Sequence, residues 1–430
     1  MIMRPIRYPR YNTSYGFKFM MLTIMVIFST SSVSGDWLSF RGGPSNIGSV
    51  DSDPFLKGVD PNITWEVNLG GAVTTSTTYY DGMVAAGSEG GTLNLLDSNT
   101  GSFLWNKTLG SDIFSTPAFD PVNGAIVALT ENGMAYSLSL ENGEILWTWS
   151  SSSGSRILSS PQIYRGRIYF GSYDSNVYCL DAERGKLIWS NPGCGDRVHT
   201  TGGFYDDLVM FGSCSGSLKA FNTDNGSVIW SFLDSYIPSS PAVFDERVYF
   251  GSYDENIYCL DARDGGLIWN TTLGGEIYSS PAVKDDYLAV GSNDGFLHCL
   301  DTSTGELTWT REMGKQPQES SPVITSEHVV VTGSQGLSVL TIGNGSVVAS
   351  LELGSCGESS PAVVDDRIYY GDQLGYLRSV RFGGEEPVDG EEIPDEDNGI
   401  MWTLPLSILI VILIASFIVV DIYLRRKVKD

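Results

Sequence analysis

This 430-residue chain contains six cysteines, a residue type that can bind metal ions or form disulfides. Cys179, Cys259 and Cys299 each open a segment of one kind, such as "CLDAERGKLIW". Cysteines that hold one position in separate repeats do not easily converge on a metal ion, so we interpret these three as small buried hydrophobes. Cys194 and Cys214 fall in two connections that a four-stranded meander brings to one face. A disulfide between them is therefore a candidate in an oxidising compartment.

Histidine and serine offer little further chemistry. His199, His298 and His328 occupy three different positions of the repeated text, which argues against a zinc or copper site. The serine-rich motif "SSP" recurs along the chain, whereas a nucleophilic serine would be unique. Loops such as "GSYDSN" lack the later carboxylates of a twelve-residue calcium loop, so turn chemistry explains them better. We predict no catalytic, cofactor-binding or metal-binding residue.

Any functional residue must be positioned by this repeat. The motif "SSPAV", or a degenerate relative, recurs every 39 to 44 residues. Each copy is followed by an alternating stretch such as "RIYFGS", a turn, a second apolar stretch and a last segment that usually ends in tryptophan. Four strands in about 40 residues are typical of a propeller blade. We predict an all-β, eight-bladed propeller from the third position of the motif, which falls at Thr77, Pro117, Pro161, Gly202, Pro241, Pro281, Pro322 and Pro361.

The ends of the repeat array predict how the ring closes. The eighth copy stops before its tryptophan strand, and an unmatched strand, "NITWEVNLG" (62–70), precedes the first copy. An open ring would expose two strand edges, so we expect 62–70 to complete blade eight. Ala349 fills the seventh tryptophan position. The other positions predict rings that dock between blades, with the indole N–H on a nearby carbonyl: Trp65, Trp105, Trp147, Trp189, Trp230, Trp269 and Trp309.

A family resemblance rests on an eleven-residue segment with a small residue first, glycine seventh and tryptophan last. Its best copies are 179–189, 259–269 and 299–309, and with the lead-in "DWLSFRGGPSNIGS" they resemble the pyrroloquinoline-quinone-type (PQQ) repeat propellers over 36–383. That superfamily holds quinoprotein alcohol dehydrogenases and non-catalytic propellers such as the lipoprotein of the bacterial β-barrel assembly machine. The catalytic relatives use a calcium-held quinone covered by two adjacent bridged cysteines. This chain has no adjacent cysteine pair and lacks long insertions, so we expect the non-catalytic branch, without PQQ or calcium.

The most variable text lies just before each "SSP" motif, where an inner strand would enter the central channel. Channel mouths built by repeats are where propellers usually bind ligands. The alternative is that these residues are merely solvated loops. The candidate binding residues at this mouth are Phe114, Arg156, Arg197, His199, Glu276, Tyr278, Glu319 and Glu358.

Outside the leader, five sequons offer sites for N-glycosylation. Two of them directly follow a docking tryptophan, on an outermost strand where a glycan could shield an exposed edge. Two others precede turn glycines, and Asn-Gly turns explain those without a sugar. The five asparagines are Asn62, Asn106, Asn225, Asn270 and Asn344.

The two ends of the chain predict export and membrane anchoring. Basic residues, a short apolar run and small residues make 1–35 a signal peptide, or alternatively a retained N-terminal anchor. Residues 384–399 are an acidic linker that cannot bury enough apolar surface to fold. Residues 400–424 are long and apolar enough for a transmembrane helix, and the basic tail 425–430 marks the cytoplasmic side. We therefore expect a cell-membrane protein whose ectodomain lies outside.

Charge and architecture limit the function classes. The formal net charge of −25 excludes a nucleic-acid partner, because such proteins usually need a basic face. We predict a monomeric head that binds or scaffolds an unknown protein or glycan partner at the channel mouth. Two alternatives stay open: a PQQ-dependent quinoprotein oxidoreductase, and a surface adhesion or carbohydrate-binding component.

Overall fold

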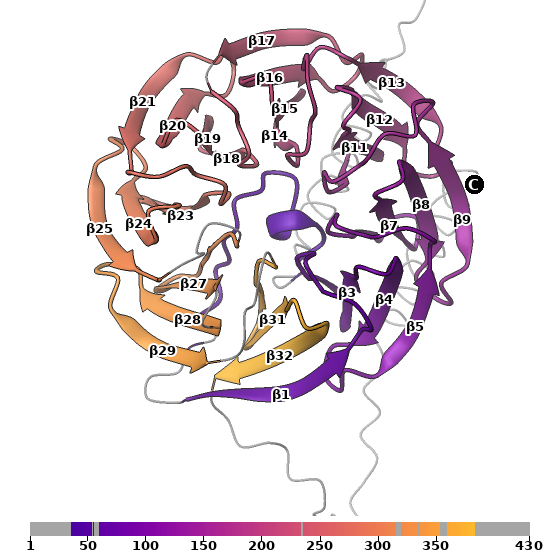
Figure 1. Ribbon diagram of the computed structural model, residues 1–430, viewed down its shortest axis with the longest axis horizontal. Helices are drawn as coiled ribbons and strands as arrows, with labels where there is room; N and C mark the ends of the chain where they lie inside the picture. Colours follow the sequence, from indigo (N-terminus) through magenta and orange to yellow (C-terminus); the bar gives the residue numbers. More distant parts are fainter. Residues whose placement is uncertain are drawn as a thin grey trace, which may run out of the picture. The chain divides into compact units, whose positions relative to one another are not determined.

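The repeats form sheets because β-branched and aromatic residues alternate in short runs between glycine-containing turns. The computed structural model describes residues 36–53, 55, 60–233, 235–314, 320–333, 336–352 and 359–382. Within these residues, 32 strands make eight four-stranded sheets around a central axis (Figure 1). Neighbouring strands within each sheet are antiparallel. The prediction of an all-β propeller with eight blades is confirmed.

Blades one to four each take four consecutive strands. Blade one holds β2 (Thr78–Tyr80), β3 (Met83–Gly87), β4 (Thr92–Asp97) and β5 (Phe103–Thr108). Blade two holds β6 (Ala118–Asp120), β7 (Ala125–Thr130), β8 (Met134–Ser139) and β9 (Ile145–Ser150). Blade three holds β10 (Gln162–Tyr164), β11 (Arg167–Gly171), β12 (Val177–Asp181) and β13 (Leu187–Asn191). Blade four holds β14 (Gly203–Tyr205), β15 (Leu208–Gly212), β16 (Ser217–Asn222) and β17 (Val228–Leu233).

Blades five to seven repeat this order, and blade eight departs from it. Blade five holds β18 (Ala242–Phe244), β19 (Arg247–Gly251), β20 (Asn256–Asp261) and β21 (Leu267–Thr272). Blade six holds β22 (Ala282–Lys284), β23 (Tyr287–Gly291), β24 (Phe296–Asp301) and β25 (Leu307–Glu312). Blade seven holds β26 (Val323–Ile324), β27 (His328–Gly333), β28 (Gly336–Thr341) and β29 (Val347–Glu352). Blade eight holds β30 (Ala362–Val364), β31 (Arg367–Gly371), β32 (Tyr376–Phe382) and, from the start of the chain, β1 (Pro61–Asn68).

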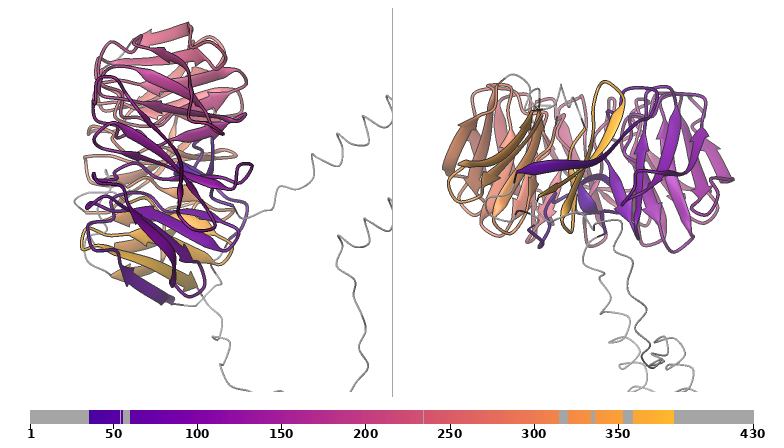
Figure 2. Two further views of the ribbon diagram at one scale, coloured as in Figure 1. Left: turned by 90° about the vertical axis from the view of Figure 1, so that its right-hand side faces the viewer. Right: turned by 90° about the horizontal axis from the view of Figure 1, so that it is seen from below.

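The connectivity gives the ring two distinct ends (Figure 2). Each inner strand begins at an "SSP" motif, and because the strands are antiparallel, the turn between the second and third strands lies at the same end. We call this the mouth end. The turns between the first and second strands, and between the third and fourth, lie at the far end. β32 is the third strand of its blade, so it ends at Phe382 at the far end of the ring.

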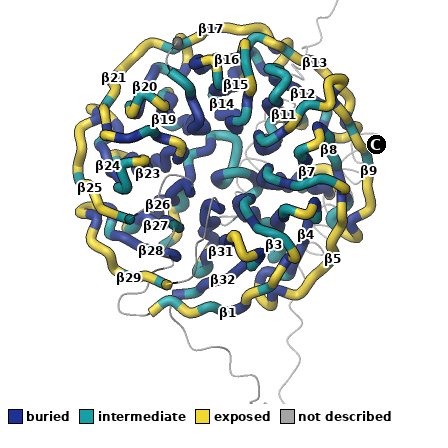
Figure 3. The backbone as a smooth tube through the Cα atoms, viewed as in Figure 1, coloured by how far each residue is buried: buried dark blue, intermediate teal, exposed yellow. Residues whose placement is uncertain are grey.

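Burial follows from this stacking of blades. The second and third strands are covered on both faces by neighbouring blades and are almost entirely buried, whereas the outermost strands are largely exposed (Figure 3). The core is therefore divided into clusters between successive blades rather than gathered in one centre.

Tryptophan and glycine fit together at the junction between blades. The ring of Trp189 in blade three lies against Gly226 of blade four, where a Cβ atom would come within 2.5 Å of the indole. Trp189 Nε1 donates to the carbonyl of Thr223 at 2.9 Å. Six other tryptophans make the corresponding bond with the next blade: Trp65, Trp105, Trp147, Trp230, Trp269 and Trp309.

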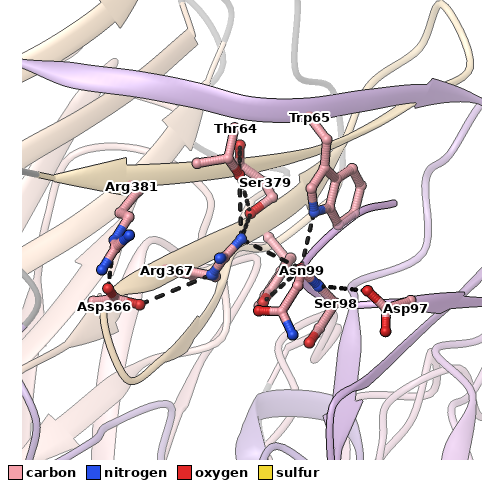
Figure 4. Close-up of polar contacts among 10 residues, drawn as sticks. Thr64, Trp65, Asp97, Ser98, Asn99, Asp366, Arg367, Ser379 and Arg381 are labelled. Carbon is pink, nitrogen blue, oxygen red and sulfur yellow. Dashed lines mark hydrogen bonds and ion pairs between the residues drawn. The ribbon is translucent and has the colours of Figure 1, made fainter. Parts of the chain in front are cut away.

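The ring closes through β1, as predicted. β1 pairs antiparallel with β32, and Trp65 Nε1 donates to the carbonyl of Ser98 in blade one at 2.9 Å. Figure 4 shows that Arg367 reaches the same place, with Nη1 3.3 Å from Thr64 Oγ1 and 3.4 Å from the Ser98 carbonyl. The hydroxyl of Tyr369 also donates to that carbonyl. One carbonyl of blade one therefore holds three donors from blade eight.

The seventh junction lacks a tryptophan and is filled differently. Ala349 belongs to the same core cluster as Phe55 and Phe382, whose rings meet edge to face with centroids 4.5 Å apart. Two phenylalanines, one near each end of the described residues, therefore supply aromatic volume at the blade that lacks a docking tryptophan.

The lead-in, residues 36–53, lies inside the ring (Figure 1). It contains the one-turn helix η1 (Phe40–Gly42), and its backbone bonds to the inner strands of blade after blade in chain order. Blade three is held by its Gln162 side chain, which contacts Ser39 Oγ at 2.6 Å. The backbone bonds to the other blades join Trp37 to Tyr79, Leu38 to Phe119, Pro44 to Phe204, Ser45 to Val243, Ile47 to Val283 and Gly48 to Ile324.

The remaining expectations on organisation lie outside the described residues. These are the signal peptide (1–35), the acidic linker (384–399), the membrane helix (400–424) and the basic tail (425–430). In the part of the chain that the structure describes, no helix has the length and apolar character to span a bilayer.

Candidate functional site

The mouth end of the channel opens into a cavity of about 420 Å³, which we call the cup. Its size lies within the range of about 300–1,000 Å³ that is usual for small-molecule sites. Its walls are a ring of eight hydroxyls, one from each blade, below an arc of aromatic and apolar side chains. The eight ring residues are Ser76, Thr116, Ser160, Thr201, Ser240, Ser280, Ser321 and Ser360.

The hydroxyl ring explains the second letter of the "SSP" motif. The backbone N–H of Thr116 donates to Ser160 Oγ in the next blade at 2.9 Å, and that of Ser160 donates to Thr201 Oγ1 at 3.2 Å. Five further pairs of ring residues in neighbouring blades make the same hydrogen bond from backbone N–H to side-chain hydroxyl. Seven of the eight ring hydroxyls, all but that of Ser76, thus join two neighbouring blades in the described structure.

The lead-in forms the floor of the cup. Phe40 lines it, and Arg41 beside Phe40 is only 2% exposed. Arg41 Nε donates to the carbonyl of Asn46 at 3.1 Å, and Nη2 donates to the carbonyl of Pro281, next to the ring residue Ser280, at 2.9 Å. Burial lowers the pKa of Arg41 to about 9. The channel therefore ends blind, above a buried cation.

Aromatic residues gather on the blade-four to blade-six side of the mouth. His199 Nε2 lies 3.2 Å from the hydroxyl of Tyr236, and its Nδ1 lies 3.7 Å from Cys214 Sγ. The ring of Tyr236 contacts those of Tyr253 and Tyr278, which are 45% and 37% exposed. Burial, and then the charge of Arg197, lowers the pKa of His199 to about 4. This imidazole is neutral at physiological pH and acts as a polar wall rather than a cation.

Two arginines flank this aromatic group at the rim. Arg156 and Arg197 both lie over the ring of Tyr173, with guanidinium carbons 5.5 and 5.6 Å from its centroid. Arg156 also pairs with Glu131 at 2.5 Å, and Arg197 approaches Asp196 at 3.6 Å. Both side chains are about half exposed, so they remain accessible to a ligand at the mouth.

The predicted mouth residues are only partly brought together. Phe114, His199 and Tyr278 line the cup, whereas Arg156 and Arg197 stand at the rim. Glu276 is absent from the lining, and its carboxylate accepts a hydrogen bond from Asn293 at 3.0 Å. The predicted residues Glu319 and Glu358 lie outside the described residues.

Sequence reasoning missed three components of this site. Tyr236 stood in the variable text "DSYIPS" but had no periodic signal to distinguish it from a loop residue. The serines of the ring were recognised as structural, but not as a lining. Phe40 and Arg41 belong to the lead-in that carries part of the family resemblance, but nothing in the sequence placed them at the channel, because their position depends on how the lead-in threads the ring.

The candidate disulfide between Cys194 and Cys214 is wrong: both thiols are free. Cys194 is fully buried in the core cluster of Trp189 and Val198. Cys214 instead turns toward His199. Burial raises the pKa of the Cys194 thiol to about 12, which suits a packing role. The other cysteines interpreted as buried hydrophobes, Cys179, Cys259 and Cys299, are 0% exposed.

The sequons divide as their local chemistry suggests. Asn225 and Asn344 cap turns, since their side-chain oxygens accept the backbone N–H groups of Ser227 and Ser346. The other three asparagines lie on outermost strands: Asn62 on β1, Asn106 on β5 and Asn270 on β21. Their modification stays a prediction.

Comparison with known proteins gives a family and a fold. No curated protein matches the sequence. Residues 72–382 match the family described as beta-alanine-activating enzyme, beta-propeller. The chain belongs to this beta-propeller family. The match to the beta-alanine-activating enzyme beta-propeller runs from just before β2 to the end of β32, so the lead-in and the closing strand precede it.

Solved structures share the architecture at low identity. BamB from Moraxella catarrhalis is 18% identical, with a TM-score of 0.65 over 76% of this chain and 99% of that one. The quinohemoprotein alcohol dehydrogenase from Comamonas testosteroni is 12% identical, with a TM-score of 0.72 over 84% of this chain and 82% of that one. The computationally designed protein Ika8 is 20% identical, with a TM-score of 0.65 over 73% of this chain and 97% of that one. At these identities the likenesses show the propeller fold alone.

Proposed function

We propose that this protein is a non-catalytic propeller that binds a protein partner at its mouth end and acts as a scaffold at a membrane surface. One observation carries the proposal: the lead-in lies across the channel, so the cup at the mouth end is a recess with a closed floor, separate from the far-end recess beside Asp36 and Lys284. Exposed tyrosines and arginines surround the cup, and these two residue types are enriched at binding hot spots. They are Arg156, Arg197, Tyr253 and Tyr278, and the half-buried ring of Tyr173 lies beneath the two arginines.

Membrane anchoring is the second part of the proposal. Residues 400–424 would span the bilayer once, with the ectodomain outside and the tail 425–430 in the cytoplasm. The chain leaves the ring at Phe382, at the end opposite the mouth, which suits a mouth that receives partners. Protease added to intact cells should remove the propeller and spare a tag placed on the C-terminus.

A photo-crosslinking experiment tests partner binding. A benzoylphenylalanine placed at Tyr253 in the full-length chain should capture a defined partner in native membranes. The matched control is the same probe at Tyr205, which also lies near a stacked arginine, Arg263, but at the far end of the ring. Equal capture from both positions, or from neither, would reject the mouth as the docking surface.

A quinoprotein oxidoreductase is the rival function, favoured by the likeness to the quinohemoprotein dehydrogenase. The residues present do not fit a calcium-held quinone. The described lining of the cup offers hydroxyls and aromatic rings but no carboxylate. Among the described residues, no group of three histidine, cysteine or acidic side chains could hold a metal ion. Dye reduction after addition of PQQ and calcium would favour the enzyme over the scaffold.

Adhesion or carbohydrate binding is the remaining alternative, which a glycan-binding screen of the full-length chain would detect.

A further inference from the structure

The ring hydroxyls have hydrogen-bond capacity left over. Each Ser or Thr oxygen that accepts a backbone N–H still carries one O–H proton. Within the described residues, the ring hydroxyls donate to no protein acceptor, and their oxygens line the cup. Up to eight hydroxyl donors therefore converge on one small cavity.

Arg41 adds an uncompensated positive charge below this ring. Its two described hydrogen bonds go to neutral carbonyls, and its Nη1 is buried without a partner among the described residues. No described carboxylate forms an ion pair with it, although Asp and Glu total 51 in the chain. Natural proteins usually pair a buried charge, because an isolated one is costly to remove from water. Arg41 does not itself line the cup, so a bound anion would compensate its charge through the floor at Phe40 rather than by direct contact.

Three described acids near the mouth are already engaged. Glu131 pairs with Arg156, Asp196 lies beside Arg197, and Glu276 accepts a bond from Asn293. The cup is thus rich in donors and free of carboxylates in its described lining, within a strongly acidic protein. Such a cavity favours a negatively charged group that accepts hydrogen bonds.

We propose that the cup binds a small ligand through an oxyanion, a carboxylate or phosphate group, held by the hydroxyl ring above Arg41. This inference rests on the proposed function of the mouth as a binding site and names the chemistry of its ligand. The aromatic arc of Phe114, Tyr236 and Tyr278 covers the less polar body of the ligand. Arg197 at the rim attracts the ligand and contributes less than Arg41, because it is exposed to solvent.

Calorimetric titration of the full-length protein with inorganic phosphate and with malate, at constant ionic strength in chloride, tests the proposal. We expect saturable binding of at least one of these probes, and the comparison separates phosphate from carboxylate chemistry. Arg41→Met, which keeps the volume and removes the charge, should weaken binding about tenfold or more. Arg197→Gln should weaken it by a smaller factor.

Arg263→Gln is the matched control. Arg263 is also exposed, lies 5.9 Å over a tyrosine ring and pairs with an acid, but it belongs to the far end of the ring. Its replacement should leave anion binding unchanged. If Arg41→Met does not fold, comparing the anion affinities of Arg197→Gln and Arg263→Gln still tests whether the anion binds at the mouth. No anion binding by the wild-type chain, equal effects of the two exposed arginines, or binding of calcium in place of anions would refute the proposal.

The outcome is separable from that of the proposed function. Capture of a partner at Tyr253 without any oxyanion binding leaves the docking surface standing and rejects the ligand. Oxyanion binding without capture of a partner supports the ligand and rejects the docking surface.

Discussion

At the scale of single residues, the polar groups of the site differ in their hydrogen-bond partners. His199 is held between the Tyr236 hydroxyl and the Cys214 thiol, with a pKa lowered to about 4. Ser240 accepts a backbone bond from the neighbouring blade, whereas the adjacent Ser239 has a buried hydroxyl without a partner among the described residues. These differences lead to two predictions.

Replacing His199 should change how stability depends on pH. The unfolded chain takes up a proton at the ordinary pKa of 6.5, but the folded protein does so only near pH 4. The folded state therefore loses stability as pH falls from about 6.5 toward 4. Urea-unfolding midpoints measured between pH 7 and pH 4.5 should fall less steeply in His199→Gln than in the wild type. Parallel curves would show that His199 is not buried as described.

Two neighbouring serines should respond oppositely to alanine. Ser240→Ala removes the acceptor of the Thr201 N–H and should cost about 1–3 kcal/mol, because that buried donor is left unsatisfied. Ser239→Ala removes a buried hydroxyl with no partner in the described structure, and should be neutral or stabilising. Chemical denaturation of both variants measures the difference. A larger loss in Ser239→Ala would contradict the assignment of the ring.

At the scale of elements, strands and junctions could be predicted because their signals are local and repeated. Trp189 and Gly226 are 37 positions apart, and each has counterparts at the same phase in other blades. The cup could not be predicted in the same way. Arg41 reaches Pro281 across 240 positions, and no periodicity links the two. The Cys194 error has the same cause, because the sequence gives the connection a residue occupies but not the side to which its thiol turns.

Glycine substitutions should separate backbone strain from the clash with a docking tryptophan. Gly226 and Gly166 have almost the same backbone angle, φ +71° and +72°. A Cβ at Gly166 meets nothing within 4 Å, whereas one at Gly226 would meet the Trp189 ring. Gly166→Ala should cost about 1 kcal/mol, for the left-handed backbone alone. Gly226→Ala should cost roughly 1–3 kcal/mol more, because it overpacks the junction. Equal losses in thermal unfolding would mean that the indole can move aside.

At the scale of the whole molecule, closure decides whether eight similar units make one cooperative body. The bonds on the Ser98 carbonyl join the first blade to the last. Corresponding triplets occur on Thr223 and Thr302, where arginine, tyrosine and tryptophan of one blade meet one carbonyl of the next. The closing junction is therefore built like an internal one, and the chain break is hidden within a complete blade.

Removing Trp65 should loosen the closing strand selectively. Trp65→Ala and Trp309→Ala each delete a docking indole, and each should cost about 3–5 kcal/mol. Only Trp65 lies on β1, so hydrogen exchange of β1 should accelerate in Trp65→Ala and stay slow in Trp309→Ala. Exchange that rises equally in both variants would indicate that β1 does not fasten the ring independently.

The lead-in also has a consequence for how the molecule is made. It precedes every blade in the chain, and it contacts blades one to seven in the order in which a ribosome produces them. Each newly made blade therefore finds its binding segment already present, so that the lead-in can serve as a template during translation. In a circularly permuted protein with this segment last, the eight blades would have to form around an empty channel, and the lead-in would have to insert afterwards.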